Sequence, residues 1–279
     1  MAMKLWNKNK KNKNTDWFSL TSILMTILVI LFIGSAVFSI ILGGIPDFRQ
    51  TIQSQEVLFA LRLSIITSTL STALVMIFAL PTAYTLTRTQ MPCKQICELL
   101  IELTLSLPYL LLGLSLLILF SSPPGKWLKS MGFPVVFAPA GIVMAHLLVN
   151  LPYAIRMIKT AFACSDERLE YIARTLGASR FRSFVTVLLP LCRTNLISTF
   201  ILTWARAMGE FGGTLMLVGI TRMKTETLPG SIYLSISTGN TQTAMSTAML
   251  MLLISGAAMA LSHLADRMNK NRHRKAAEL

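Results

Sequence analysis

Residues 166–190, DERLEYIARTLGASRFRSFVTVLLP, form a charged stretch that is rich in helix-forming residues and lies between two long apolar segments. So many charges are costly among lipid tails, so this stretch is expected outside the hydrocarbon core. A helix-forming segment held at one face of a bilayer predicts a membrane protein that is driven by a partner there.

The composition of the whole chain supports a membrane protein. Of its 279 residues, 53% are hydrophobic and only 14% are charged, and the mean hydropathy is +0.60. Such a chain is far more apolar than a typical soluble domain. The predicted fold class is therefore an all-α, polytopic bundle embedded in the bilayer.

Apolar windows long enough to cross a bilayer, for which a helix needs about 20 residues, recur along the chain. They cover residues 20–42, 57–86, 99–120, 139–158, 196–220 and 244–264. The first is longer than the apolar part of a signal peptide, and no small-x-small cleavage site follows it, so we interpret it as a retained anchor. Residues 135–137 either begin the fourth span or belong to the loop before it.

The basic residues predict the orientation, because Lys and Arg near span ends stay on the cytoplasmic side. Most of them lie in the N-terminal arm, after the second span, around the inner end of the fourth span and in the C-terminal tail. Both termini are therefore expected in the cytoplasm. The predicted division is a basic arm over 1–18, a transmembrane domain over 19–266 with a long inner loop over 160–192, and a basic tail over 267–279.

The net charge of +14 would suggest nucleic acid in a soluble protein. Here the positive charge collects at span ends, which the membrane topology explains, so lipid rather than nucleic acid is the expected surrounding. The Lys- and Asn-rich run in the N-terminal arm is predicted to be solvated and disordered.

No catalytic or metal-binding motif is present in the sequence. The cysteines Cys93, Cys97, Cys164 and Cys192 form neither a ligand pattern nor a disulfide framework, and we interpret them as incidental thiols in a reducing compartment. A G-x-x-x-x-G-K-[ST] loop is missing, so the chain itself is not expected to hydrolyse ATP. His146 lies in the fourth span, where it is either satisfied by a neighbouring group or, alternatively, relays protons.

The 166–190 stretch itself predicts two short helices. Asp166 is a candidate N-cap, and Leu169, Ile172, Ala173 and Leu176 recur at helical spacing. Gly177 is the usual residue just beyond a helix end. A second apolar stripe follows at Phe181, Phe184, Val185 and Leu188, and Pro190 is expected to break the chain before the fifth span.

These helices would form a compact cytoplasmic projection. It could fit a groove in another protein. The alternative is an interfacial helix that lies on anionic lipid with its Arg residues toward the head groups. The local sequence pattern leaves both interpretations open.

The spacing resembles the EAA loop of ABC importer permeases, whose pattern is E-A-A, three residues, Gly, nine residues and I-x-L-P. Here Ala173 stands in place of the second alanine and Gly177 in place of the glycine, with Val187, Leu189 and Pro190 at the end of the pattern. The resemblance implies that the loop docks in a cleft of a cytoplasmic ATPase subunit and transmits its closure to the membrane helices.

The match departs from the family pattern at its start. Tyr171 and Ile172 occupy the Glu position and the first Ala position, and Glu170 lies one residue earlier. The resemblance therefore implies that Glu170 makes the acidic contact that the motif glutamate makes in the family. The coupling residues implied by the resemblance are Asp166, Glu170, Ala173, Gly177, Ala178, Leu189 and Pro190.

A second signature narrows the family. The sequences ARAMGEFGGTLMLVG over 205–219 and TRMKTETLPGSIYLSISTGN over 221–240 are similar to permeases for molybdate and tungstate, with sulfate permeases as close relatives. This resemblance implies the MetI-like permease fold, with about six transmembrane helices and a cytoplasmic helix-turn-helix coupling loop. It places the chain in the inner (cytoplasmic) membrane.

The same resemblance implies the partners. They are a second copy of the chain, two cytoplasmic ABC ATPase subunits that bind ATP and Mg, and an extracytoplasmic oxyanion-binding protein. This chain would hold no cofactor or metal of its own. Transport would proceed by alternating access, with ATP-driven closure of the ATPases pushing on the coupling loops.

Arg206 and Glu210 are the unusual charges of the fifth span. Four residues apart on one helix, they would share a face and pair, which lowers a cost of about 2.5 to 3.5 kcal/mol for each lone charge. They either line the passage or dimer interface or simply fasten two helices together. The candidate residues there are Arg206, Gly209, Glu210, Phe211, Gly213 and Thr214, whose glycines would allow close helix packing.

A passage for a tetrahedral dianion needs no tight site, because tight binding would slow release, and selectivity can be left to an external receptor. Glu210 is not expected to bind a dianion, since like charges repel. Arg222 and Lys224, on the expected outer side, either attract the anion or a receptor or belong to an ordinary solvated loop.

Other functions stay open. Within transport, the alternatives are sulfate and, further away, ferric ion or thiamine. A membrane-integral enzyme would need a cluster of acidic or His residues, whereas the acidic residues here are scattered. A membrane anchor or sensor whose loop only recruits a partner is the alternative of another class.

Overall fold

The computed structural model describes residues 17–277, with side chains described up to Leu261. The Lys- and Asn-rich run of residues 8–14, which the sequence predicts to be disordered, therefore lies outside the described residues. Every regular element in the described part is helical, as expected for an all-α protein. The helices are α2 (Trp17–Gly44), α3 (Phe48–Gln53), α4 (Gln55–Arg88), α5 (Lys94–Ser106), α6 (Tyr109–Ser121), α7 (Pro123–Ser130), α8 (Pro139–Ala163), α9 (Glu167–Thr175), α10 (Arg180–Ser183), α11 (Leu189–Met208), α12 (Gly212–Val218), α13 (Leu228–Ser237) and α14 (Thr241–Ala277).

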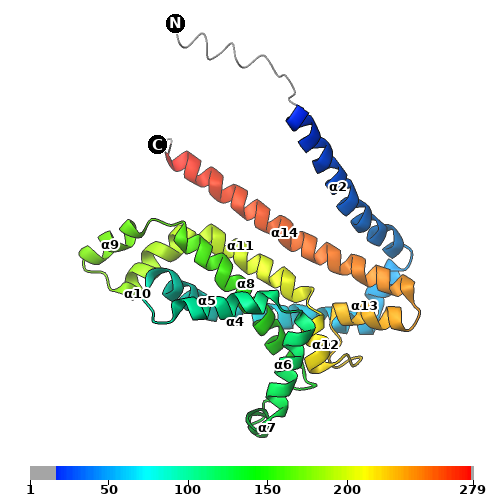
Figure 1. The fold of residues 1–279 in the computed structure, drawn as a ribbon. Helices are drawn as coiled ribbons and strands as arrows, with labels where there is room; N and C mark the ends of the chain where they lie inside the picture. The colour runs from blue at the N-terminus through cyan, green and yellow to red at the C-terminus, as the bar shows by residue number, and fades with distance from the viewer. Residues whose placement is uncertain (1–16, 278–279) are drawn as a thin grey trace.

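The centre of the bundle is the packing of α4 against α8, with α11 beside both (Figure 1). Toward the C-terminal ends of α4 and α8 the core contains Val75, Ile158, Phe162 and Leu188. Small and hydroxyl side chains on α4, such as Ser68, are buried and let neighbouring backbones approach closely. These three helices form the frame that positions the rest of the molecule.

Five helices are long and apolar enough to cross a membrane, or six if the bent pair α5 and α6 counts as one span. The expectation of six spans is met in that sense. The third span is not one straight helix, however, because α5 and α6 meet at an angle of 113°. Pro108 explains the bend, since it removes a backbone donor and forces the residue before it into an extended conformation.

The fifth span differs from the expectation at both ends. One continuous helical stretch runs from Arg180 to Met208, so Pro190 does not break the chain. Proline fits there because it stands in the first turn of α11, directly after a π-helical turn, Phe184–Leu188, in which the Leu189 N–H reaches the Phe184 carbonyl. The span then ends at Met208 instead of continuing to residue 220.

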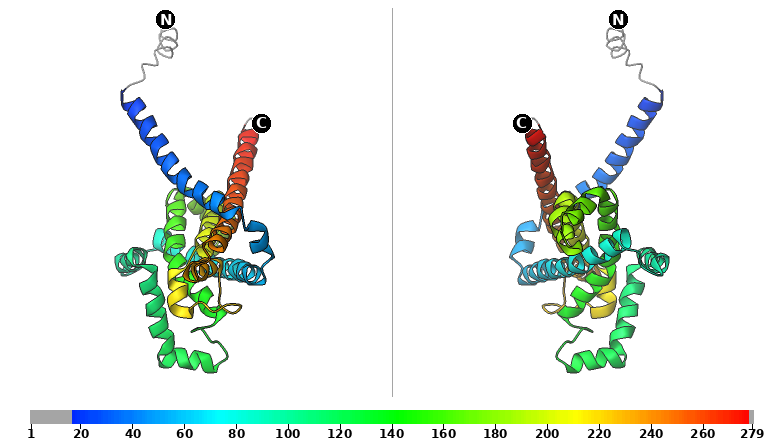
Figure 2. Two further views of the ribbon diagram at one scale, coloured as in Figure 1. Left: turned by 90° about the vertical axis from the view of Figure 1, so that its right-hand side faces the viewer. Right: turned by 90° about the vertical axis from the view of Figure 1, so that its left-hand side faces the viewer.

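Helix α2 stands apart from the rest of the bundle. Figures 1 and 2 show it diverging from α14 toward its N-terminal end. The hydrophobic window of α2 is 0% buried. Contact with α14 is close near the C-terminal end of α2, where Gly44 lies against Met245 and Met249. Most of the apolar surface of α2 is thus left for lipid or another chain to cover.

Residues 135–137, left open by the sequence, belong to the loop before α8, which begins at Pro139. Val135 is nevertheless buried, and its carbonyl lies against Gly141. Helices α6 and α7 project from the bundle as an arm, which is clearest in Figure 2.

Candidate functional site

The predicted projection is present, and we call residues 164–183, which hold α9 and α10, the inner knob, after the side of the membrane on which the sequence predicts it. Asp166 caps α9 as expected, since its side chain accepts from the Arg168 N–H at 2.9 Å. Gly177 has a φ of +93° and ends the helix. The Ala178 N–H donates to the Ala173 carbonyl, and the Gly177 N–H donates to Arg174, both at 3.0 Å, which is a Schellman motif.

The inner knob is fastened to the bundle by Arg88, the last residue of α4. Its Nε donates to Glu170 at 2.9 Å, and its Nη1 pairs with Glu167. Its Nη2 donates to the carbonyls of Phe162 and Ser165, at 2.8 and 3.0 Å, at the end of α8. One side chain therefore joins α4, α8 and α9, in the fork geometry that guanidinium provides.

The amphipathic helix α9 directs Glu170 toward the bundle, where its carboxylate meets Arg88. Glu170, to which the resemblance gives the acidic role of the motif, is 7% exposed. The apolar residues of the predicted stripe face outward instead: Leu169, Ile172 and Leu176 are 43%, 55% and 83% exposed. Phe181 on α10 is exposed as well. An apolar surface held outside the spanning helices is a surface built for contact.

The other residues of the loop motif differ in how far they are buried. Tyr171, at the expected glutamate position, is exposed, and its ring lies 5.7 Å from the Arg174 guanidinium carbon. Ala173 and Ala178 are half-buried in the turn, Leu189 is half-buried at the start of α11, and Pro190 is exposed beside a groove that also contains Leu169 and Thr186. The knob and the start of α11 thus share one outward surface.

Arg88 was not identified from the sequence beyond its use as a topological charge. Its partners lie 74 to 82 positions away in the chain. Spacing rules relate residues within a few positions of each other, so a single sequence does not reveal that Arg88 contacts Glu170.

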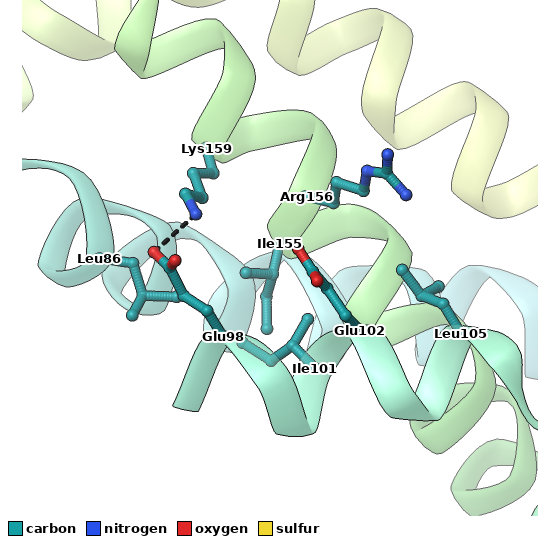
Figure 3. A pocket seen from close by; sticks show the side chains of 8 residues that line it. All are labelled: Leu86, Glu98, Ile101, Glu102, Leu105, Ile155, Arg156 and Lys159. Carbon is teal, nitrogen blue, oxygen red and sulfur yellow. Dashed lines mark hydrogen bonds and ion pairs between the residues drawn. The ribbon is translucent and has the colours of Figure 1, made fainter. Parts of the chain in front are cut away.

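A second charged contact ties α5 to α8 near the C-terminal end of α8. Figure 3 shows the pocket between them, where Lys159 donates to Glu98 at 2.6 Å. Arg156 lies in the same pocket, and its guanidinium extends away from the acidic side chains in Figure 3.

The predicted pair of Arg206 and Glu210 does not form: no ion pair joins them among the described residues. The prediction was wrong because α11 ends at Met208 with Gly209 at its C-cap, so the four-residue spacing no longer gives a shared face.

Glu210 instead caps the short helix α12. Its carboxylate accepts from the Gly213 N–H at 2.7 Å, from the Thr214 N–H at 3.1 Å and from the Thr214 hydroxyl. These are orphan donors of a helix start, and the helix dipole favours a negative charge there. The hydroxyl of Thr214 is therefore engaged by Glu210.

His146 is the other polar neighbour of Glu210. Its Nε2 lies 3.9 Å from the Glu210 carboxylate, and both side chains are almost fully buried. Within the described residues neither ring nitrogen has a hydrogen-bond partner, so the expected satisfaction by a backbone or hydroxyl group was wrong. The two side chains are therefore neighbours without a hydrogen bond between them, and we call this contact the His146–Glu210 junction.

The glycines around this junction permit close packing. A side chain on Gly113 of α6 would meet the Gly213 carbonyl oxygen at 2.5 Å, so the two helices touch through their backbones. Gly209 lies at the break between α11 and α12, and the Phe211 ring packs 5.3 Å from that of Tyr233. Three of the predicted residues, Glu210, Gly213 and Thr214, thus build the start of α12.

Arg206 has different neighbours. Its Nη2 donates to the Tyr109 hydroxyl at 2.5 Å and its Nε to the Asn150 side-chain oxygen at 3.4 Å. The Tyr153 ring centre lies 4.5 Å from the guanidinium carbon, within cation–π range. The charge is held between α6, α8 and α11.

At the opposite end of α4 from Arg88, Arg222 pairs with Glu56 at 2.5 Å, and both side chains are about half exposed. The hydrogen bond and charge of Glu56 raise the pKa of Arg222. Lys224 lies in the same exposed loop.

Residues 91–270 match a family of proteins described as the inner membrane component of binding-protein-dependent transport systems. A molybdate/tungstate transport system permease protein of Thermococcus kodakarensis is 33% identical over 60% of this chain and 64% of its own length. A probable molybdenum ABC transporter permease protein of Haloferax volcanii is 33% identical over 88% of this chain and 90% of its own. A sulfate transport system permease protein of Synechocystis is 29% identical over 80% and 82%.

The fold is similar to that of a chain in the crystal structure of a bacterial alginate ABC transporter in complex with an alginate-bound periplasmic protein. The TM-score is 0.76 at 15% identity, covering 96% of this chain and 99% of that one. The likeness confirms the expected MetI-like permease fold.

Proposed function

Because the chain belongs to the family of inner membrane components of binding-protein-dependent transport systems, we propose that it is the permease subunit of an ABC importer for a tetrahedral oxyanion, molybdate or tungstate. It carries the substrate inward by alternating access, driven by ATPase subunits on the cytoplasmic face. ATP and Mg are bound by those subunits and not by this chain.

The proposal is carried by the orientation of the inner knob, which buries its acidic residue and exposes its apolar residues. Its buried acid, Glu170, is tied to Arg88 at the end of α4, while Leu169, Ile172, Leu176 and Phe181 face outward. A pull or push on the outward surface therefore reaches α4 and α8 directly through one guanidinium. That arrangement suits a contact that must transmit force, and an ATPase cleft is its proposed partner.

A lipid contact for the same surface is the weaker alternative. An interfacial helix buries its apolar face and exposes basic residues along the opposite one. In the inner knob the face opposite the apolar residues is acidic and is occupied by Arg88. The exposed Arg168, Arg174, Arg180 and Arg182 would suit anionic lipid, so it is the fixed link of Glu170 to Arg88, and not the charge of the knob, that favours a protein partner.

The choice of substrate follows the relatives named for molybdate and tungstate, to which this chain is 33% identical. Sulfate is the alternative, because a relative named for sulfate is also similar over most of the chain. All three anions are tetrahedral dianions, so the same passage could serve them. The external binding protein then selects among them.

Two copies of the chain form the membrane part in this proposal, with both termini in the cytoplasm. The exposed length of α2 supports a second copy, because so large an apolar surface is covered by lipid or protein. The inner knob and the basic segments near it lie on the same side, which agrees with Lys and Arg being retained inside.

The test is uptake by proteoliposomes that contain this chain, its ATPase and its oxyanion-binding protein. We expect ATP-dependent accumulation of molybdate or tungstate that a large excess of sulfate does not suppress. Preferential accumulation of sulfate would reassign the substrate. No accumulation of any oxyanion, with the complex assembled and ATPase active, would identify an anchor or sensor instead.

A further inference from the structure

Arg206 carries a positive charge in the last turn of α11, at the end of a helical stretch that is long and apolar enough to cross a membrane. No ion pair of Arg206 occurs among the described residues. Its neighbours Tyr109, Asn150 and Tyr153 are neutral. A charge kept inside a membrane without a counter-ion is costly, and such residues mark ion and substrate pathways.

The neighbours of Arg206 hold the guanidinium in place and leave part of it available. Asn150 is 1% exposed and is fixed by its own bond to the His146 carbonyl at 2.9 Å. The hydrogen bonds of Arg206 use Nε and Nη2, and no partner of Nη1 is found in the described part of the chain. Hydrogen bonds from Nε and Nη2 thus orient the Arg206 guanidinium, while Nη1 stays available to a ligand.

Polar residues continue from Arg206 toward the inner end on two packed helices. On α11, Asn195 and Thr199 share a face with Arg206 by helical spacing, although Thr199 is buried and its hydroxyl donates to the Asn195 carbonyl. Leu202 is the apolar member of that face and is half-buried. Asn195 is exposed, as is Arg156 toward the inner end of α8. Exposed polar side chains on spanning helices face water or protein and not lipid.

We propose that the Arg206 guanidinium is the contact that the oxyanion makes inside the passage. This inference rests on the proposed function and deepens it. A guanidinium presents parallel donors that match two oxygens of a tetrahedral anion. Tyr109, Asn150 and Tyr153 act as positioning residues. Glu210 forms no ion pair with Arg206 in the described structure, because its carboxylate is directed to the start of α12.

The partial exposure of Arg206 suits a transient contact. An enclosed cage would hold the anion and slow its release, whereas a single open guanidinium attracts it and lets it leave. The exposed Arg156, further toward the inner end, gives the departing anion a second positive side chain.

The first test uses a reporter at Leu202, one helical turn before Arg206 and partly exposed. Cys93, Cys97 and Cys164 are replaced by Ser, the buried Cys192 is kept, and Leu202→Cys is introduced into the full transporter. We expect a negatively charged thiosulfonate reagent to react about tenfold faster than a positively charged one of similar size, and molybdate to slow the reaction. Both effects should disappear in R206Q.

The second test is uptake. R206Q should lower the rate of molybdate uptake about tenfold or more, while R206K, which keeps the charge but loses the fork, should retain part of it. R49Q is the matched control, since Arg49 is an exposed arginine on the short helix α3, and it should stay close to the parent rate. Basal ATPase activity should be similar in all three variants.

The outcomes separate the two proposals. Uptake by the parent complex together with normal uptake by R206Q overturns the role of Arg206 and leaves the permease function intact. Equal reaction of both reagents with the parent reporter, without protection by molybdate, overturns it as well, even if R206Q does not assemble. Failure of the parent complex to accumulate any oxyanion refutes the proposed function itself.

Discussion

The Arg88 guanidinium donates to the Glu170 carboxylate at 2.9 Å and so joins the end of α4 to a helix 82 positions later in the chain. Both side chains are largely buried, at 8% and 10% exposure. The contact fixes the orientation of α9 and therefore decides which side chains the inner knob presents to its partner.

Glu170→Gln should lower the free energy of unfolding by about 1.5 to 3 kcal/mol, because it removes the buried charged hydrogen bond of Arg88 while leaving the guanidinium its contacts with Glu167, Phe162 and Ser165. Thermal unfolding in detergent and the ratio of uptake to ATP hydrolysis would both measure it. Glu167→Gln is the matched control, since that carboxylate is 51% exposed and its pair should contribute about 1 kcal/mol or less. Equal effects of the two substitutions would contradict the assigned role of Glu170.

Gly177→Ala should cost about 1 to 2 kcal/mol through backbone strain alone, since φ is +93° and no atom lies within 4 Å of an added Cβ. We expect reduced coupling of ATP hydrolysis to uptake. Gly132 provides a control with the same geometry outside the knob, at φ +89° with open space around it. Gly132→Ala should lower stability by a similar amount but leave coupling unchanged; a loss of coupling there would mean that general instability explains both.

Gly113→Ala should destabilise the contact of α6 with α12, because the new Cβ would lie 2.5 Å from the Gly213 carbonyl oxygen. Overpacking of this kind costs about 1 to 3 kcal/mol. Gly256→Ala in α14 meets nothing within 4 Å and should be neutral or stabilising by up to about 1 kcal/mol. Melting temperatures of the two variants provide the comparison, and a stable Gly113→Ala protein would rule out the close approach.

Glu210→Ala should unpair the N–H groups at the start of α12, at a cost of about 1 to 3 kcal/mol. Because Glu210 and Arg206 have different partners, exchanging the two residues should not restore what either single change loses. Uptake by the exchanged variant is the measurement. A variant that works better than both singles would show that the two side chains pair in another state of the transporter.

The sequence predicted best what local chemistry controls. Asp166 and Gly177 were assigned correctly because a cap and a left-handed turn depend on neighbouring residues only. The spans were found because lipid sets their length and composition.

The errors have a common physical cause. The pairing of Arg206 with Glu210 assumed an unbroken helix, and the break at Pro190 assumed an ordinary helix interior. Gly209 ended the first helix, and the π-helical turn placed the proline where its missing donor does no harm. Arg88 and the inward turn of Glu170 needed the packing of α4 against the inner knob, which no spacing rule contains.

The π-helical turn at 184–188 also governs which changes of length the protein tolerates. Such a turn holds one more residue than an α-helical turn, so the helix after it continues as if that residue were absent. Removing Val185, which is exposed, should therefore leave the inner knob and Arg206 in their places and preserve uptake. Removing one residue between 196 and 202 should rotate Arg206 by about 100° about the helix axis and abolish uptake. Uptake by the two deletion variants thus tests whether the π-helical turn at 184–188 tolerates the loss of one residue while the segment 196–202 does not.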